Sequence, residues 1–198
     1  MNQDVAPASG AWRALPAALH EDAALIAEVL AIHRELRVTL CAREMTICNQ
    51  EWDIEARALR RIEEWRVLLL LTPWMLARLL IPDGPPLGLQ PPADCPAACQ
   101  ANADGTILGP ACSFTLLGQP QRAHLNYDPR LGHYLLQPLC LEMSAYRNAE
   151  EVFAAWNEVI RIRDANLEQA RRDCPLQREI SRREFFRLNR HNAQAPFT

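Results

Sequence analysis

The sequence predicts an α+β fold, a single domain in which an antiparallel β-sheet is flanked by an N-terminal and a C-terminal helix. Apolar residues recur at helical spacing in residues 16–37 and again in residues 148–173. Between these segments, residues 52–58 alternate apolar with polar side chains and residues 65–72 form an apolar run, and both patterns are typical of strands. The 198 residues, 49% hydrophobic and 23% charged, are enough to form one core.

The first predicted helix covers residues 16–37. Pro16 suits the first turn of a helix, and Glu21 and Asp22 lie near the end where the helix dipole favours acidic side chains. His33 lies on the apolar stripe of this helix, so we expect a buried imidazole with its hydrogen bonds satisfied. The stripe follows a three-and-four spacing through Leu19, Ala23, Ile26, Leu30, His33 and Leu36.

A hairpin is predicted next. Residues 52–58 read as a half-buried strand and residues 65–72 as a second, more buried one, with a polar turn at residues 60–64. The side chains of Glu51, Asp53 and Glu55 then project from one face of the first strand.

The middle of the chain is predicted to contain a long loop and two further strands. Residues 82–110 hold seven of the fifteen prolines and four of the seven glycines, without a periodic apolar pattern. Strands are expected at residues 111–118 and 132–141, and residues 124–130 are expected to form a long connection between them.

The last predicted helix begins near Asn148, which forms a capping-box pattern with Glu151. It is expected to end at about Asp173, because Cys174-Pro175 follows. The predicted organisation is therefore a flexible N-terminus at residues 1–15, one domain at residues 16–175, and a basic tail at residues 176–198.

Charge and hydropathy disfavour several classes of protein. All 21 basic residues are arginines; residues 1–160 hold 12 of them against 19 acidic residues, whereas residues 161–198 hold nine against five. An acidic body disfavours binding to nucleic acid. The most apolar stretch, residues 66–82, is interrupted by Pro73 and Arg78 and is too short for a membrane helix, so no membrane insertion is expected. The first twenty residues lack the pattern of a secretory signal, so export is not expected.

Motifs of catalysis or metal binding are weak. The five histidines show no HExxH spacing, and neither a GxSxG motif nor a phosphate loop occurs, so no catalytic residue and no cofactor is predicted. Cys95 and Cys99 have the spacing of a loose metal-ligand pair, but tetrahedral sites normally need four ligands and no second pair is visible. Two unpaired thiols in a loop are the simpler interpretation, and no metal is predicted.

One segment resembles a known family. Thr72-Pro73-Trp74-Met75-Leu76, continuing through Leu79-Leu80-Ile81-Pro82, is similar to the signature of the HybE-type [NiFe]-hydrogenase assembly chaperones. The likeness extends over residues 20–190 through Trp65, Phe114 and Tyr134-Leu135. It implies a cytoplasmic accessory chaperone, not an enzyme, that binds the hydrogenase small-subunit precursor with its twin-arginine signal peptide before export. The large subunit and other maturation factors are further candidate partners.

Recognition of such a signal would need carboxylates beside an apolar groove, because the signal presents two guanidiniums followed by an apolar helix. The acids on the first strand and the apolar residues after Thr72 are the candidates. Alternatively, the acids are merely solvated and the apolar run fills the core. The predicted peptide-binding residues are Glu51, Asp53, Glu55, Thr72, Pro73, Trp74, Met75, Leu76, Leu79 and Leu80.

Two further hypotheses concern other segments. The tail sequence around Arg182, Arg183, Phe185 and Phe186 resembles a twin-arginine motif and is hypothesised to act as an internal mimic of the client, with a basic tail packing on the acidic body as the alternative. The competing functional hypothesis is an iron-sulfur or metal-site protecting factor that uses the Cys95 and Cys99 pair; a hydrolase or transferase built on the three acids comes third.

Overall fold

A six-stranded antiparallel sheet with the order β1-β2-β3-β6-β5-β4 forms the centre of the fold. The computed structural model describes residues 12–43, 52–87, 89 and 108–173. The chain divides into two compact units, residues 1–149 and 150–198, which are described separately. The strands are β1 (Glu55–Ile62), β2 (Trp65–Thr72), β3 (Met75–Pro82), β4 (Ala111–Leu116), β5 (Gln119–Asp128) and β6 (Gly132–Cys140).

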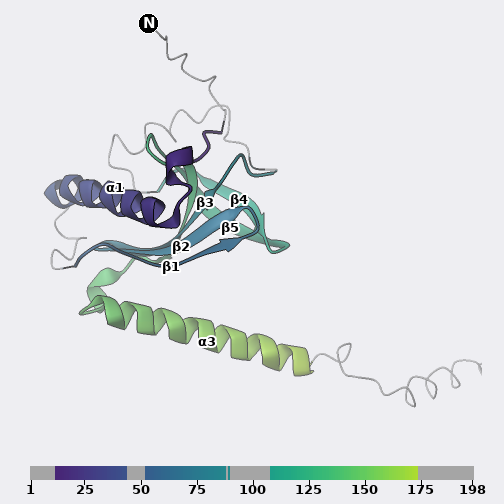
Figure 1. The fold of residues 1–198 in the computed structure, drawn as a ribbon. Coiled ribbons are helices and arrows are strands. Elements are labelled where there is room, and N and C mark those ends of the chain that lie inside the picture. Colours follow the sequence, from purple (N-terminus) through teal and green to yellow (C-terminus); the bar gives the residue numbers. More distant parts are fainter. Residues whose placement is uncertain (1–11, 44–51, 88, 90–107, 174–198) are drawn as a thin grey trace, which may run out of the picture. The chain divides into compact units, whose positions relative to one another are not determined.

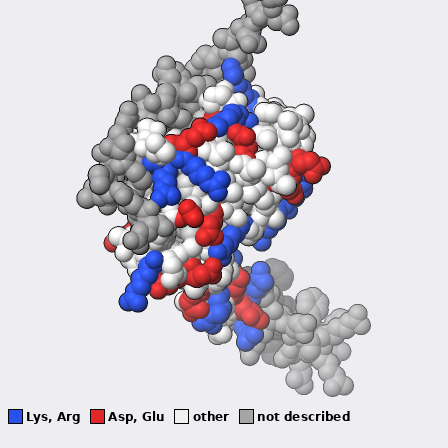
Figure 2. Space-filling model, turned by 60° about the vertical axis from the view of Figure 1, so that its left-hand side comes forward, with Lys and Arg blue, Asp and Glu red and all other residues white. Residues whose placement is uncertain are grey.

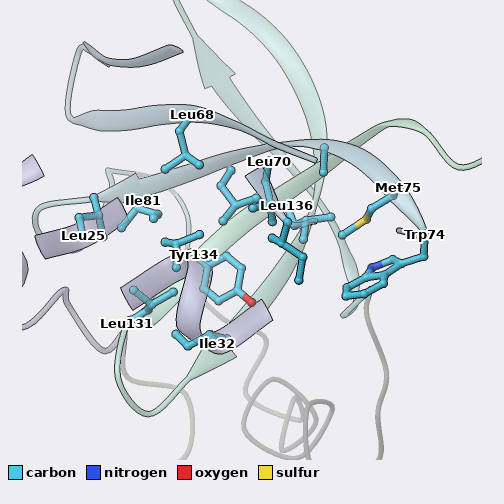
Figure 3. Packing of buried hydrophobic residues seen from close by; sticks show 14 of the residues in the cluster. Leu25, Ile32, Leu68, Leu70, Trp74, Met75, Ile81, Leu131, Tyr134 and Leu136 are labelled. Carbon is cyan, nitrogen blue, oxygen red and sulfur yellow. The ribbon is translucent and has the colours of Figure 1, made fainter. Parts of the chain in front are cut away.

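Helix α1 (Asp22–Arg43) follows a short 3-10 turn, η1 (Ala17–Leu19), and lies across one face of the sheet (Figure 1). Its buried residues Leu25, Val29 and Ile32 belong to one core cluster with alternate residues of β2, β3 and β6. Tyr134 lies at the centre of the part drawn in Figure 3, between the helix and the strands. This cluster fixes α1 to the sheet through its apolar stripe.

The opposite face of the sheet carries a second core cluster because the sheet curls. Trp65 of β2 and Phe114 of β4 lie in strands that are not neighbours, yet their ring centroids are 5.5 Å apart in an edge-on arrangement. The backbone N–H of Leu117 also donates to the carboxylate of Glu63, at 3.0 Å. The β4–β5 hairpin therefore curves over the start of β2.

Residues 12–15 pack on the sheet as a short strap. The backbone of Arg13 donates to Nδ1 of His133 at 2.7 Å and accepts from the backbone N–H of His133 at 2.8 Å. Leu15 is buried in the cluster beneath α1. Residues 12–15 are thus held at the β5–β6 turn. Residues 1–11, the rest of the N-terminus that is predicted from the sequence to be flexible, lie outside the described residues.

The second unit contains α3 (Ala149–Asp173), which follows a 3-10 turn, η2 (Met143–Ala145). Acidic Glu150 and Glu151 lie in its first turn and Arg171 and Arg172 in its last, which suits the helix dipole. In the described part of the chain, no helix has the length and apolar character needed to span a membrane.

The predicted fold class is confirmed, as are β2 and the two long helices, while three details differ. First, β1 continues to Ile62, through the first part of the turn predicted at residues 60–64. Ala58 has a φ of 57°, and the pairing with β2 is irregular between Arg57 and Arg60. This irregularity shifts the alternation of apolar and polar side chains from which the end of the strand was predicted. Second, the apolar stretch after Trp74 forms strand β3. The loop predicted at residues 82–110 falls largely outside the described residues.

The third difference is β5, because the connection predicted at residues 124–130 was wrong. Most of that stretch belongs to a ten-residue strand whose polar side chains hid its pattern. Asn126 accepts a hydrogen bond from the backbone N–H of Gly109 at 3.0 Å, and Nδ1 of His124 lies 2.8 Å from the carbonyl oxygen of the same glycine. His124 and Asn126 of β5 therefore bind a neighbouring backbone segment.

Candidate peptide-binding site

The Thr72–Met75 turn joins β2 to β3 through only two residues, Pro73 and Trp74. The hydroxyl of Thr72 accepts from the backbone N–H of Met75 and donates to the carbonyl of the same residue, both at 3.0 Å. Proline at the first of the two central positions supplies the fixed φ that such turns use. The segment that carried the family resemblance is therefore a tight hairpin turn closed by its own threonine.

Strand β1, with the acidic residues at its start, begins beside this turn. In the β1–β2 register Glu55, the first residue of β1, pairs with Leu71, the residue before Thr72. Asp53 lies two residues earlier in the chain, just before β1. The side chain of Asp53 is 95% exposed and that of Glu55 is 34% exposed. The structure thus brings both described acids to the turn end of the sheet, whereas Glu51 lies outside the described residues.

Each of these acids contacts an arginine of the same chain. Nη2 and Nε of Arg57 donate to one oxygen of Glu55, at 2.7 and 3.0 Å. Nη1 of Arg37, on α1, lies 3.8 Å from a carboxylate oxygen of Asp53, a loose ion pair. Figure 2 shows acidic and basic side chains interspersed over the face drawn there. The acids at the turn are therefore guanidinium sites with partners already in place.

Sequence reasoning missed these two arginines. The spacing of Glu55 and Arg57 contains the signal for one pair, since residues two apart in a strand project from the same face. Arg37 gives no such signal, because it reaches Asp53 from a helix 16 residues away in the chain. The ion pair between Arg37 and Asp53 therefore depends on the packing of α1 near the start of β1.

The apolar half of the predicted site is buried. Trp74 is 3% exposed, and Figure 3 places it with Met75 at one end of the core cluster, with Leu25 and Ile81 at the other. In this structure the side chains of the apolar run after Thr72 belong to the core on the two faces of the sheet. A role for these residues in contacting a peptide stays a prediction. The buried members of the predicted site are Thr72, Pro73, Trp74, Met75, Leu76, Leu79 and Leu80.

The remaining predicted residues lie outside the described residues. They are the tail residues Arg182, Arg183, Phe185 and Phe186, and the thiols Cys95 and Cys99. Among the residues that are described, no group of three or more His, Cys, Asp or Glu side chains is arranged to hold a metal ion.

A second charged cluster ties α1 to the β5–β6 turn on the sheet. The guanidinium of Arg130 donates to both carboxylate oxygens of Glu35 at 2.9 Å and lies 3.3 Å from Glu28 and 3.4 Å from Asp128. The hydrogen bonds from Arg130 lower the pKa of Glu35 below its usual value. Because one arginine occupies three carboxylates here, this cluster serves to position α1.

His33 is buried, as expected from its place on the stripe, and its Nδ1 lies 2.8 Å from the carbonyl oxygen of Val29. Burial lowers the pKa of His33, although the hydrogen bond to Val29 and the negative charge of Asp128 oppose part of this effect. The unfolded chain therefore binds this proton more readily than the folded chain. The resulting stability is present above about pH 6.5 and is lost as the pH falls through the pKa of the folded state.

We therefore expect the free energy of unfolding to fall between pH 7.5 and pH 5, and to fall less in a His33→Met variant. Urea titrations at the two pH values measure the difference. The pKa of His133 is also lowered by burial, so part of the fall remains in the variant. A His20→Gln variant, which loses an imidazole at an exposed position, is the matched control. Identical pH dependence in wild type and His33→Met would contradict this account.

Comparison with known proteins identifies a family. A family model described as [NiFe]-hydrogenase assembly, chaperone, HybE matches residues 24–188, which begin within α1 and continue past the end of α3. No curated protein and no solved structure matches the chain.

Proposed function

The chain belongs to the HybE family of [NiFe]-hydrogenase assembly chaperones, and from this membership we propose that it works in the cytoplasm by binding the small-subunit precursor through its twin-arginine signal peptide. The proposed contacts are the carboxylates of Asp53 and Glu55. The large subunit is a further candidate client. The chain acts by binding and carries out no chemistry on its client.

The observation that supports this site is the pairing of accessible carboxylates with arginines at the turn end of the sheet. Asp53 and Glu55 already accept guanidiniums from Arg37 and Arg57, so their position and geometry suit arginine. A client with two adjacent arginines would replace these internal partners. The exchange should cost least at Asp53, because its present ion pair is 3.8 Å long and its carboxylate is 95% exposed.

The buried residues of the Thr72–Met75 turn would hold the strands in place during this exchange. Thr72 closes the turn and Trp74 packs into the core, so the β1–β2 register that sets Glu55 beside Leu71 is fixed. Exchange of arginines then requires movement of side chains only. Such a preorganised pair of carboxylates should bind with little loss of conformational entropy.

Reversing both charges tests the proposal. In an Asp53→Arg/Glu55→Arg variant we expect the affinity for a synthetic twin-arginine signal peptide to fall at least tenfold, because two charge-assisted hydrogen bonds are replaced by repulsion. Fluorescence anisotropy of a labelled peptide measures the affinity, and circular dichroism checks the fold. A peptide with two lysines should bind wild type more weakly, since lysine cannot make the bidentate contact.

The matched control is Glu21→Arg/Glu64→Arg, which changes net charge equally at exposed positions away from the turn. This control should retain peptide affinity to within about twofold if local geometry rather than overall charge matters. Equal losses in the two double variants would contradict the assignment of the site. Pull-down of the whole small-subunit precursor with and without its signal peptide tests the client itself: capture that does not depend on the signal would contradict signal-peptide recognition.

A further inference from the structure

Helix α3 carries an exposed apolar stripe. Val159, Ile162 and Leu167 are 54%, 47% and 51% exposed, and with Arg163 and Asn166 they line one hollow along the helix surface. Large apolar side chains at these levels of exposure are normal singly, but here three of them share one helix face. The stripe is therefore a candidate interaction surface.

The spacing of the stripe is that of a helix pair. Val159, Ile162 and Asn166 follow one another at three and four residues, the pattern of a seam between two helices, and Leu167 flanks this seam beside Asn166. From Asn157 to Arg172 every residue except Ile160 is exposed, so this half of the helix has few contacts to stabilise it. Because most of the stability of a helix in a protein comes from packing of its apolar face, an apolar partner would stabilise it.

The charges of α3 indicate which partner fits. Residues 149–160 contain three glutamates and no arginine, whereas residues 161–173 contain four arginines and three acidic residues. Two copies of this helix placed antiparallel would set the acidic half of each against the more basic half of the other. A parallel pair would instead oppose like charges.

We infer that α3 is a self-association surface, on which a second copy of this chain packs its own α3 in an antiparallel pair across Val159, Ile162 and Leu167. A twofold axis that passes near Ile162 would bring the apolar stripes of the two copies into contact, since a twofold-symmetric interface uses the same surface patch on both copies. Asn166 lies within the seam, where one polar residue favours a single register at some loss of affinity.

Ion pairs within α3 leave the net charges of its two halves, −3 for residues 149–160 and +1 for residues 161–173, unchanged. Glu158 pairs with Arg161 at 2.6 Å, and Glu168 pairs with Arg172 at 2.9 Å, all within one helix. Helix α3 has 25 residues and a length of roughly 37 Å. One such helix pair buries less area than a standard interface, so the dimer should be weak, with a dissociation constant in the micromolar range.

Sedimentation velocity of the full chain from about 5 to 200 μM tests the inference, a range that brackets micromolar association. We expect wild type to shift from monomer to dimer over this range, and an Ile162→Glu variant to weaken association at least tenfold because it places a charge in the apolar seam. Asn157→Glu adds the same charge on the opposite side of α3 and should change association less than twofold. Circular dichroism at low concentration confirms that both variants keep their helix content.

Two results would overturn the inference. One is a wild-type chain that stays monomeric at 200 μM, and the other is a dimer that Ile162→Glu leaves unchanged, since that dimer would use another surface. Signal-peptide affinity measured in the same Ile162→Glu variant should stay at the wild-type value, because the proposed peptide contacts lie at the β1–β2 strands. The outcome for α3 is therefore independent of the outcome for Asp53 and Glu55.

Discussion

An Arg66→Ala variant should lose about 3 kcal/mol of unfolding free energy, the largest effect that the structure leads us to expect from a single side chain outside the apolar core. Arg66 is 1% exposed although it carries a charge. Its Nε donates to Asp83 at 2.7 Å, and its Nη1 donates to the carbonyl of Leu19 at 3.2 Å and lies 3.4 Å from Asp22. One guanidinium thus joins β2, the residue after β3 and the start of α1.

The loss combines two physical causes. Truncation removes the long side chain that fills the space between α1 and the sheet, and it removes the hydrogen bonds that hold the N-terminal end of α1 in place. Urea denaturation measures the result as a lower midpoint with an unchanged slope. Arg66→Lys should recover only part of the stability, because one ammonium cannot reproduce the fork of contacts.

Arg61→Ala is the matched control, because Arg61 contacts the same acid, Asp83, at 3.1 Å from an exposed position. Its side chain is 58% exposed, and an ion pair in solvent contributes little, so we expect a loss below about 1 kcal/mol. Equal losses for Arg61→Ala and Arg66→Ala would show that pairing of the charge on Asp83, rather than the buried contacts of the Arg66 guanidinium, determines stability.

Arg66 also illustrates what the sequence can and cannot predict. The apolar run that surrounds it predicted strand β2 with the bounds that the structure has, and the capping pattern at Asn148 predicted α3 to within one residue. These features are local, since the periodicity of apolar residues and the capping pattern of a helix depend on residues close together in the sequence. The partners of Arg66 lie 17 and 44 residues away in the chain, so no local pattern could identify them.

The candidate site divides in the same way. Alternation predicted that Asp53 and Glu55 lie on one strand, but only Glu55 is part of β1, and Asp53 precedes it. Their guanidinium partners depend on the packing of α1 and on a register that Ala58 shifts. The apolar run after Thr72 is compatible with a groove or with a core, because hydrophobicity alone does not say which. Burial of Trp74 at 3% exposure shows that the run forms core in this structure.

Gly132→Ala should cost about 3 kcal/mol of unfolding free energy, a loss comparable to that expected for Arg66→Ala. Gly132 begins β6 with φ 76°, a conformation that residues with a Cβ rarely adopt. A Cβ at this position would lie 2.5 Å from the carbonyl oxygen of Arg13 and 2.7 Å from that of Ala14, so the strap of residues 12–15 would have to move. Moving it breaks the two hydrogen bonds between Arg13 and His133 and exposes Leu15.

Gly118→Ala separates the two contributions to that cost. Gly118 has nearly the same φ, 70°, in the β4–β5 turn, but a Cβ there would meet nothing within 4 Å. Its substitution therefore measures backbone strain alone, about 1 kcal/mol. The excess for Gly132→Ala, read from urea denaturation of both variants, measures how strongly the strap is held. Equal costs would mean that residues 12–15 contribute nothing to the stability of the sheet, because their displacement would then leave the free energy unchanged.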